Sequence, residues 1–270
     1  MSAAPGSVTI ALARGCLMEN YYKELAERYR TLRNTDREPV DFVCGILPPD
    51  GKITAADMGC GAGRYAKLFF DKLGERLFLH CFDTNEYMLD QLKSYLPGEG
   101  VSNFSAKVVD ARDVPLGDRS VDAVFCFNSV HHIGMFGFLR EASRILKPGG
   151  AAFVYTRSRE QNDRTVWGRH FPLFRRKESR LYEPEEFRFK TDRFPEFEIE
   201  TVKTFIYDRV HTRGELEEKV AARAYSPFLF YGPDEFARAF DAFRENLKRN
   251  FGDTIEWEDG KMMYVLRKRP

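Results

Sequence analysis

The 270-residue sequence lacks long apolar runs. No segment approaches the ~18 consecutive apolar residues that a membrane-spanning helix needs. The run VTIALA near the N-terminus is too short, and too poorly flanked, for a signal peptide. We therefore expect a protein that neither binds nor crosses a membrane and that works in the cytoplasm.

Cysteine is also scarce, and no two cysteines form a CxxC pair. The five are Cys16, Cys44, Cys60, Cys81 and Cys126. Two of them lie inside apolar, strand-like runs, so we expect reduced cysteines that act as small apolar residues, and no metal site. The chain also lacks a large net charge, because it has 42 basic and 41 acidic side chains. The sequence thus gives no global attraction to nucleic acid or to anionic membranes.

The first 160 residues do contain a regular alternation of short apolar runs and helical patterns. Expected strands are 53–58, 77–83, 103–110, 121–128 and 151–157, and expected helices are 63–74, 85–96 and 137–146, with a turn at 147–150. Elements that alternate at this spacing imply right-handed crossovers and a parallel sheet, so the predicted class is α/β, doubly wound. Ligands of such sheets bind at the carboxyl ends of the strands.

The second half of the chain follows another pattern. Further strands are expected at 197–210 and 261–268, with helices at 214–224 and 233–251 between them. The predicted organisation is a helical cap over 1–48, a ligand-binding core over 49–158, a basic and aromatic lid over 159–196, and the last strands over 197–270 with helices inserted at 214–251.

The stretch ADMGCGAGRY places three glycines between a strand and a helix. A dinucleotide site would require G-x-G-x-x-G, but position 64 is arginine; a phosphate-binding P-loop is excluded because no G-K-[ST] follows. An ordinary glycine-rich turn is the plain alternative. Asp57-Met58-Gly59-Cys60-Gly61-Ala62-Gly63 resembles motif I of the class I S-adenosylmethionine-dependent methyltransferases. The resemblance implies a mostly parallel, Rossmann-like sheet of seven strands, with S-adenosylmethionine as cofactor. It assigns Asp57 to the cofactor's amino group, and Gly59, Gly61 and Gly63 to close approach of the backbone.

Three later stretches extend the resemblance to about residues 50–158. Asp83 and Thr84, at the end of the second strand, match the family's ribose-binding position, although the stretch Asp83-Thr84-Asn85 could simply cap a helix. The family's acidic-then-small pair beside adenine corresponds to Asp110 and Ala111, which could also belong to a surface loop. The stretch FNSVHHIGMFGFLREASRILKPGG, which begins at Phe127, resembles the ubiquinone-biosynthesis-like, small-molecule branch, and the resemblance implies that Asn128 contacts the cofactor.

Methyl transfer is an in-line substitution, so the protein mainly aligns the reactants and excludes water. A general base is needed where the acceptor holds a proton of high pKa. His131 and His132 are the candidates, because they follow the fourth strand. In the alternative interpretation, one histidine orients the loop and the other faces solvent. The resemblance also implies that a tyrosine before the first strand closes over the cofactor; of Tyr21, Tyr22 and Tyr29, we expect Tyr29 to have this role, or else to pack in the core.

The segment from Arg157 to Arg180 holds eight basic and three acidic residues. Aromatic and histidine side chains are interleaved with them: Trp167, His170, Phe171, Phe174 and Tyr182. The segment could bind an anionic or aromatic substrate, form a solvated surface paired with nearby glutamates, or stack on RNA bases. Candidates in the inserted helices are His211, Tyr225 and Tyr231, and no spacing favours one of them.

The sequence therefore predicts an S-adenosylmethionine-dependent methyltransferase that acts on a small molecule, anionic or aromatic, as a monomer or homodimer. Nucleic acid is a less favoured partner because the overall charge is neutral. RNA or protein methylation is the alternative activity, and a non-catalytic module that binds the cofactor is the alternative class. Dehydrogenase activity is disfavoured by Arg64.

Overall fold

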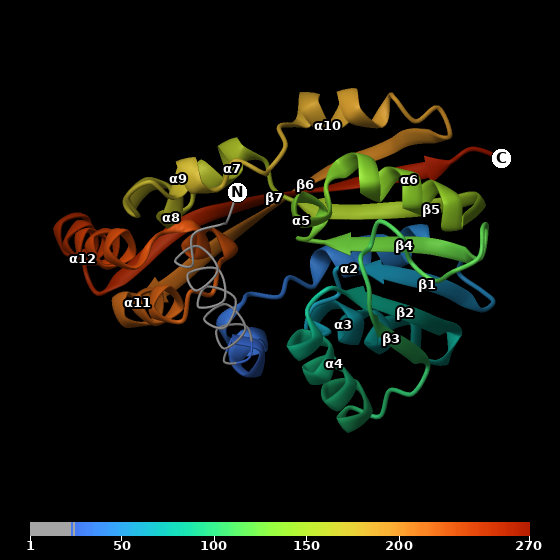
Figure 1. Cartoon of the computed structure of the whole chain (residues 1–270), viewed down its shortest axis with the longest axis horizontal. Helices are drawn as coiled ribbons and strands as arrows, with labels where there is room; N and C mark the ends of the chain where they lie inside the picture. Colours follow the sequence, from blue (N-terminus) through green and yellow to red (C-terminus); the bar gives the residue numbers. More distant parts are fainter. Residues whose placement is uncertain (1–22, 24) are drawn as a thin grey trace, which may run out of the picture.

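The computed structural model describes residue 23 and residues 25–270. Cys16, Tyr21 and Tyr22 lie outside the described residues, as does most of the N-terminal stretch that we expected to form a cap. Figure 1 shows a twisted sheet with helices on both faces and a second group of helices beside one end of the sheet.

The sheet has seven strands in the order β3-β2-β1-β4-β5-β7-β6. The strands are β1 (Ile53–Met58), β2 (Leu77–Asp83), β3 (Phe104–Val108), β4 (Val121–Phe127), β5 (Leu146–Thr156), β6 (Phe197–Thr212) and β7 (Thr254–Lys268). The first five are parallel, whereas β7 runs antiparallel to both β5 and β6. This arrangement confirms the predicted α/β class, and the strand order reverses between β1 and β4, where such sheets open a ligand crevice.

Two apolar cores bury the two faces of the sheet. One contains side chains of α2 (Glu38–Ile46), α3 (Arg64–Leu73) and α4 (Glu86–Gly98). The other contains side chains of α6 (Met135–Ile145) and α10 (Pro184–Thr191). No helix of the described part of the chain is long and apolar enough to cross a membrane.

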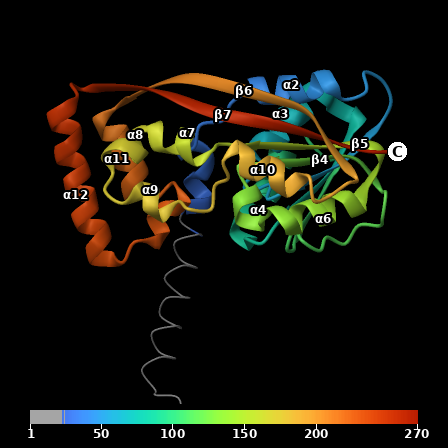
Figure 2. The same cartoon turned by 90° about the horizontal axis from the view of Figure 1, so that it is seen from above.

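A third apolar core lies outside the sheet. It is built by α8 (Val166–His170), α9 (Phe174–Lys177), α11 (Arg213–Ala221), η2 (Ser226–Phe230) and α12 (Pro233–Asn250). We call these elements, together with α7 (Arg159–Arg164), the outer helical group. Figure 2 shows β6 and β7 as a long ribbon that runs from the sheet to this group. The apolar stripe of α12, with Phe236, Phe243 and Leu247 buried, is the face that packs into this core.

Two predicted boundaries are wrong. The stretch 147–150 is part of β5 and not a turn, because the strand continues through a bulge opposite Val121 and Ala123. Gly149 supplies the positive φ, +76°, that this irregularity needs. The last strand begins at Thr254, seven residues before the apolar run at 261, since its outer half pairs with β6 in the ribbon.

Candidate functional site

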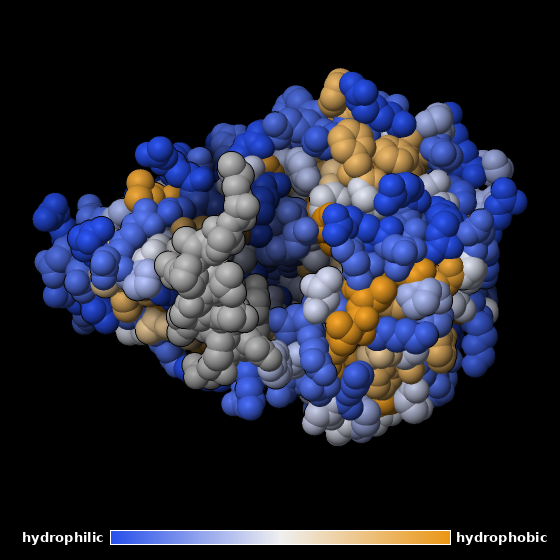
Figure 3. Space-filling view, in the orientation of Figure 1, coloured by the Kyte–Doolittle hydropathy of each residue, from blue (hydrophilic) through white to orange (hydrophobic). Residues whose placement is uncertain are grey.

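A cavity of about 600 Å³ lies between the carboxyl ends of the parallel strands and the outer helical group. Figure 3 shows a recess between these two parts, and the part of it that is visible has hydrophilic residues. Of the twelve residues predicted for the site, ten line the cavity: Tyr29, Gly59, Gly61, Asp83, Thr84, Asp110, Ala111, Asn128, His131 and His132. Asp57 and Gly63 do not, because Asp57 is buried beneath the glycine loop and Gly63 packs on α4.

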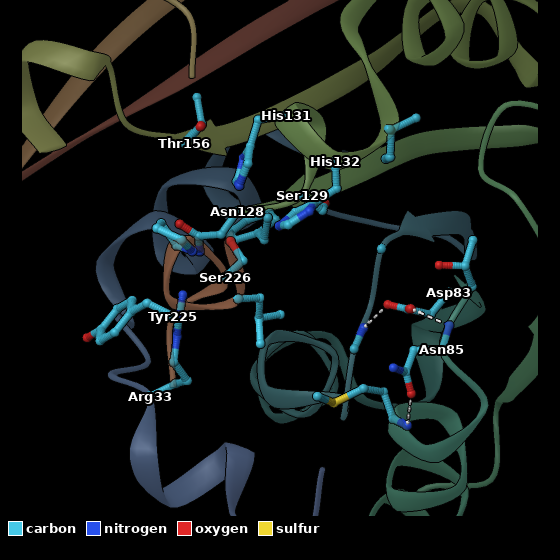
Figure 4. Close-up of a pocket in the computed structure, with 18 of the residues that line it drawn as sticks. Arg33, Asp83, Asn85, Asn128, Ser129, His131, His132, Thr156, Tyr225 and Ser226 are labelled. Atoms are coloured by element: carbon cyan, nitrogen blue, oxygen red, sulfur yellow. Dashed lines mark hydrogen bonds between the residues drawn. The ribbon is translucent and has the colours of Figure 1, made fainter. Parts of the chain in front are cut away.

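Asp83 fixes the glycine loop to the end of β2. Its two carboxylate oxygens accept hydrogen bonds from the backbone N–H groups of Gly61, at 2.8 Å, and Asn85, at 2.9 Å (Figure 4). Asn85 caps the N-terminus of α4, because its side-chain oxygen accepts a hydrogen bond from the backbone N–H of Met88. Burial raises the pKa of Asp83. The residue therefore faces the cavity as a preoriented acceptor.

Asp57 is a buried carboxyl group, 2% exposed. Its Oδ1 has no hydrogen-bond partner among the residues that the structure describes. Burial, and then the neighbouring Asp83, raise the pKa of Asp57 to about 8. A buried carboxyl group without a partner is costly, and a cationic ligand group would satisfy it. This observation fits the amino group of S-adenosylmethionine.

The three positions of the loop require glycine for different structural reasons. A Cβ at Gly59 would lie 2.5 Å from the Cβ of Ser129, and one at Gly63 would lie 3.1 Å from Cγ of Leu92. Both clashes are with the protein itself. Only at Gly61, among the three, would a Cβ meet nothing closer than the ring of Tyr29, at 3.7 Å. Packing of the protein itself therefore requires glycine at Gly59 and Gly63, and room for a cofactor stays a prediction at all three positions. All three also have positive φ, which favours glycine.

Tyr29 lies over the glycine loop, in the helical stretch 25–32. The guanidinium groups of Arg33 and Arg64 stand 5.7 and 5.0 Å from the centre of its ring. Burial raises the pKa of Tyr29, but these two cations outweigh burial and lower it. Arg64, the residue that argued against a dinucleotide, donates hydrogen bonds to Asn34 and Thr35. It thereby anchors the N-terminal stretch beside the loop.

Asp110 and Ala111 lie at the rim of the cavity. The carboxylate of Asp110 pairs with Arg112, whose Nε lies 2.9 Å from Oδ1, and this guanidinium lowers the pKa of Asp110. Ala111 is buried. The contact of Asp110 with adenine stays a prediction.

His131 and His132 belong to α5 (Val130–Ile133), and their rings are tilted by 39° with centres 4.2 Å apart. Nδ1 of His132 accepts a hydrogen bond from Arg180 at 3.0 Å. Nδ1 of His131 is buried and has no partner among the described residues. Burial lowers the pKa of both, that of His132 to about 4, and Arg180 and Arg33 add to the effect. Both rings are therefore neutral at pH 7.

Other residues of the cavity were missed at the level of sequence. They include Arg33, Asn162 and Ser226. Arg33 follows Tyr29 by four residues, a spacing that places both on one helical face, and this signal could have found it. Of the three candidates in the inserted helices, Tyr225 lines the cavity, whereas His211 stacks on Trp257 and Tyr231 donates to the carbonyl of Pro172.

The basic segment 157–180 is largely neutralised by its own acidic neighbours. Ion pairs join Arg159 to Glu186, Arg164 to Glu160, Arg175 to Asp163, Lys177 to Glu235 and Arg180 to Glu178. The interleaved Trp167, Phe171 and Phe174 are buried in the core of the outer helical group. These contacts favour the solvated-surface interpretation for most of the segment. The exceptions are Trp167, Phe174 and Arg157, which also reach the cavity.

Comparisons with known proteins agree with the fold and the glycine loop. Residues 56–154 match a family model described as "Methyltransferase domain". The chain is 30% identical over 145 residues, 52% of its length, to tRNA (carboxymethyluridine(34)-5-O)-methyltransferase ALKBH8 of Macaca fascicularis. It is 34% identical over 102 residues, 37% of its length, to sterol 24-C-methyltransferase ERG6B of Gibberella zeae. These matches cover 20% and 26% of the two relatives.

The solved structures support the fold alone. The YcgJ protein from Bacillus subtilis superposes with a TM-score of 0.62 and 13% sequence identity, over 87% of this chain and 100% of that one. The two relatives named above differ in their acceptors, one being a tRNA and the other a sterol. The acceptor must therefore be argued from the cavity.

Proposed function

We propose, from the premise that residues 56–154 form a class I S-adenosylmethionine-dependent methyltransferase domain, that this chain methylates a small molecule held in the cavity. The observation that carries the proposal is the enclosure of the glycine loop. The outer helical group and the stretch 25–33 roof the strand ends and leave about 600 Å³, within the usual range of small-molecule sites.

The chain offers a fitting group for each polar part of the cofactor. Asp57, buried without a partner at Oδ1, would hold the amino group; Asp83 would accept from the ribose hydroxyls; and Gly61 gives the backbone room. When bound, S-adenosylmethionine supplies an electrophilic methyl group on a cationic sulfur. The protein then has to align the acceptor with that group and to exclude water.

His131 would accept the proton of an acceptor that carries one. Its ring is neutral, half-buried and part of the cavity wall. The imidazole of His131 would take up the proton that the acceptor atom releases as it receives the methyl group. The low pKa makes the ring a weak base in the free protein, so the catalytic gain expected from it lies at the low end for general bases.

We expect His131→Ala to lower the methyl-transfer rate by about 100-fold and to change the dissociation constant of S-adenosylmethionine by less than about threefold. Turnover is measured with cofactor labelled in the methyl group and a metabolite extract, and affinity is measured by calorimetry. His132→Ala is the matched control, because it removes the neighbouring ring and its bond to Arg180. Equal losses of turnover and affinity in His131→Ala would assign this residue a structural role.

RNA is the second candidate acceptor, on the basis of the tRNA methyltransferase relative. The paired basic side chains and the roofed cavity argue against it. We expect the triple variant Arg164→Gln, Arg175→Gln, Arg176→Gln to keep turnover within about threefold. Turnover should also change little between 50 and 200 mM salt, because a steep salt dependence arises when basic side chains bind the phosphates of a nucleic acid.

The deciding measurement compares transfer of labelled methyl groups into the metabolite extract and into bulk tRNA. Label in tRNA, lost in the triple variant, would contradict the small-molecule proposal. Calorimetric binding of S-adenosylmethionine without transfer to any extract would instead indicate a non-catalytic binding module.

A further inference from the structure

Three guanidinium groups surround the half of the cavity that is farther from Asp83. They belong to Arg33 in the N-terminal stretch, Arg157 after β5, and Arg180 after α9. Arg33 and Arg157 line the cavity, and Arg180 contacts the lining residues His132 and Ser226. Figure 4 shows Arg33 and His131 reaching toward the same space from two sides, with Asp83 on the opposite side of the cavity.

Each guanidinium group is held in place by the protein. Arg33 donates to the carbonyl of Ala224 at 2.8 Å and stacks 4.2 Å from the ring centre of Tyr225. Arg180 donates to Ser226 at 2.9 Å and pairs with the buried Glu178 at 2.6 Å. Their orientation costs little on binding, because it is fixed before a ligand arrives.

Arg157 is held by a group of buried charged side chains on and beside β6 and β7. Its guanidinium lies 3.0 Å from the carboxylate of Asp259 on β7, and Arg209 contacts the same carboxylate at 3.1 Å. Arg209 also pairs with Asp36, as does Lys261. Beside the cavity, the carboxylate of Asp259 thus pairs with Arg157, and the carboxylate of Glu178 pairs with Arg180.

Apolar side chains also line the cavity: Trp167, Phe174, Leu181, Pro227 and Leu229. Trp167 and Phe174 are largely buried in the core of the outer helical group. A ligand that fits both the guanidinium groups and these side chains has an anionic end and an apolar body.

We propose that the methyl acceptor is a small carboxylic acid whose carboxylate binds among the guanidinium groups of Arg33, Arg157 and Arg180. Planar guanidinium donors match the two oxygens of a carboxylate. The carboxylate is the recognition group, and the methyl group goes to a nucleophilic atom on the apolar body, which lies toward the glycine loop. This inference rests on the proposed function and narrows its substrate class.

Such an anion would also change His131. The groups that face its ring are His132, Arg33, Arg157 and Arg180, with Glu178 paired to Arg180. The three cations help to lower the pKa of His131 in the free protein. A bound carboxylate opposes them, and an opposite charge within about 4–6 Å favours a protonated imidazole, commonly by 1–3 pKa units. Binding of the acid would therefore make His131 a better base when the acceptor is in place.

Matched acids and amides test the recognition step without knowledge of the natural substrate. Protein saturated with S-adenosylhomocysteine is titrated by calorimetry with benzoate and benzamide, and with octanoate and octanamide. We expect at least one acid to bind at least tenfold more tightly than its amide. Arg33→Gln should weaken the acid by at least tenfold and the amide by less than twofold. Arg28→Gln, an exposed arginine of the same helical stretch that pairs with Glu218, should change neither.

Two further measurements keep the inference separate from the proposed function. Labelled products from the metabolite extract should bind to an anion exchanger, because the carboxylate remains free; label confined to neutral or cationic products would overturn the inference and leave small-molecule methylation intact. In nuclear magnetic resonance titrations, the acid that binds should raise the pKa of His131 by about 1–2 units. Acids that bind no better than their amides, or Arg33→Gln that weakens both equally, would also overturn it.

Discussion

Replacing Asp57 with asparagine is expected to weaken S-adenosylmethionine binding by roughly 100- to 1,000-fold, or about 3–4 kcal/mol. The carboxyl group is buried, and Oδ1 has no partner among the described residues. A cationic amino group would form a charge-assisted hydrogen bond with it in a site that excludes water. Asparagine keeps the shape and loses the charge, so the cation would be left buried and only partly compensated.

The same substitution is expected to stabilise the unliganded protein at alkaline pH. Since burial raises the pKa of Asp57 to about 8, the folded chain keeps a proton there that the unfolded chain releases near pH 4. Folding stability therefore falls between about pH 4 and 8, by up to about 1.4 kcal/mol per pH unit from this group. Asparagine removes this dependence. Binding of a cation at pH 7 would release up to one proton from Asp57.

These effects are measured by calorimetry in buffers of different ionisation enthalpy and by chemical denaturation at pH 6, 7, 8 and 9. Asp90→Asn, an exposed carboxylate on α4, is the control and should leave affinity and proton release unchanged. An Asp57→Asn protein that binds within threefold of the parent, or a parent that releases no proton, would show that this carboxyl group does not face the cofactor.

The second large effect is expected at Gly59, where alanine should destabilise the fold by about 2–5 kcal/mol. The backbone has φ +82°, and the new Cβ would meet the Cβ of Ser129 at 2.5 Å. The cost combines a left-handed conformation with overpacking against a residue whose hydroxyl is already bonded to the carbonyl of Met58. Gly61→Ala, with φ +53° and no close contact, should lose only about 1–2 kcal/mol of stability.

Cofactor affinity should show the reverse order for the variants that still fold. A Cβ at Gly61 projects toward the cavity, so Gly61→Ala should weaken S-adenosylmethionine binding, as measured by calorimetry, more than it lowers the denaturation midpoint. Ser129→Gly removes both atoms that clash and should restore part of the stability of Gly59→Ala in a double variant. Equal stability of the two alanine variants would refute the division of roles within the loop.

The part of the fold that the sequence predicted best is the part made of local patterns. β1 and β2 have the predicted bounds, since each is a mostly apolar run with an aspartate at or next to its last residue and a turn behind it. The long α12 has a clear apolar stripe, Pro233 at its start and Gly252 just beyond its end, and its bounds differ from the prediction by one residue. In these segments the neighbouring residues determine the structure.

What the sequence did not predict depends on contacts between distant segments. The outer half of β7 has no apolar run, and it is a strand because β6 pairs with it. The buried role of Trp167 and Phe171 requires η2 and α12 as partners, and the place of Arg157 requires Asp259, about a hundred residues later in the chain. The sequence shows that these residues are basic or aromatic, but it does not show which distant segments pack against them.

The ribbon of β6 and β7 also determines how the cavity can open. Both strands pass from the sheet into the outer helical group without a break, and they stay hydrogen-bonded to each other along the way. A hydrogen-bonded two-stranded ribbon bends as a unit and contains no hinge. The helices at its end can therefore move only a short distance relative to the sheet. Exchange of cofactor and acceptor is then expected to proceed by movement of the segment around Tyr29, which contacts the two sides of the cavity through side chains such as Arg33 and Arg64.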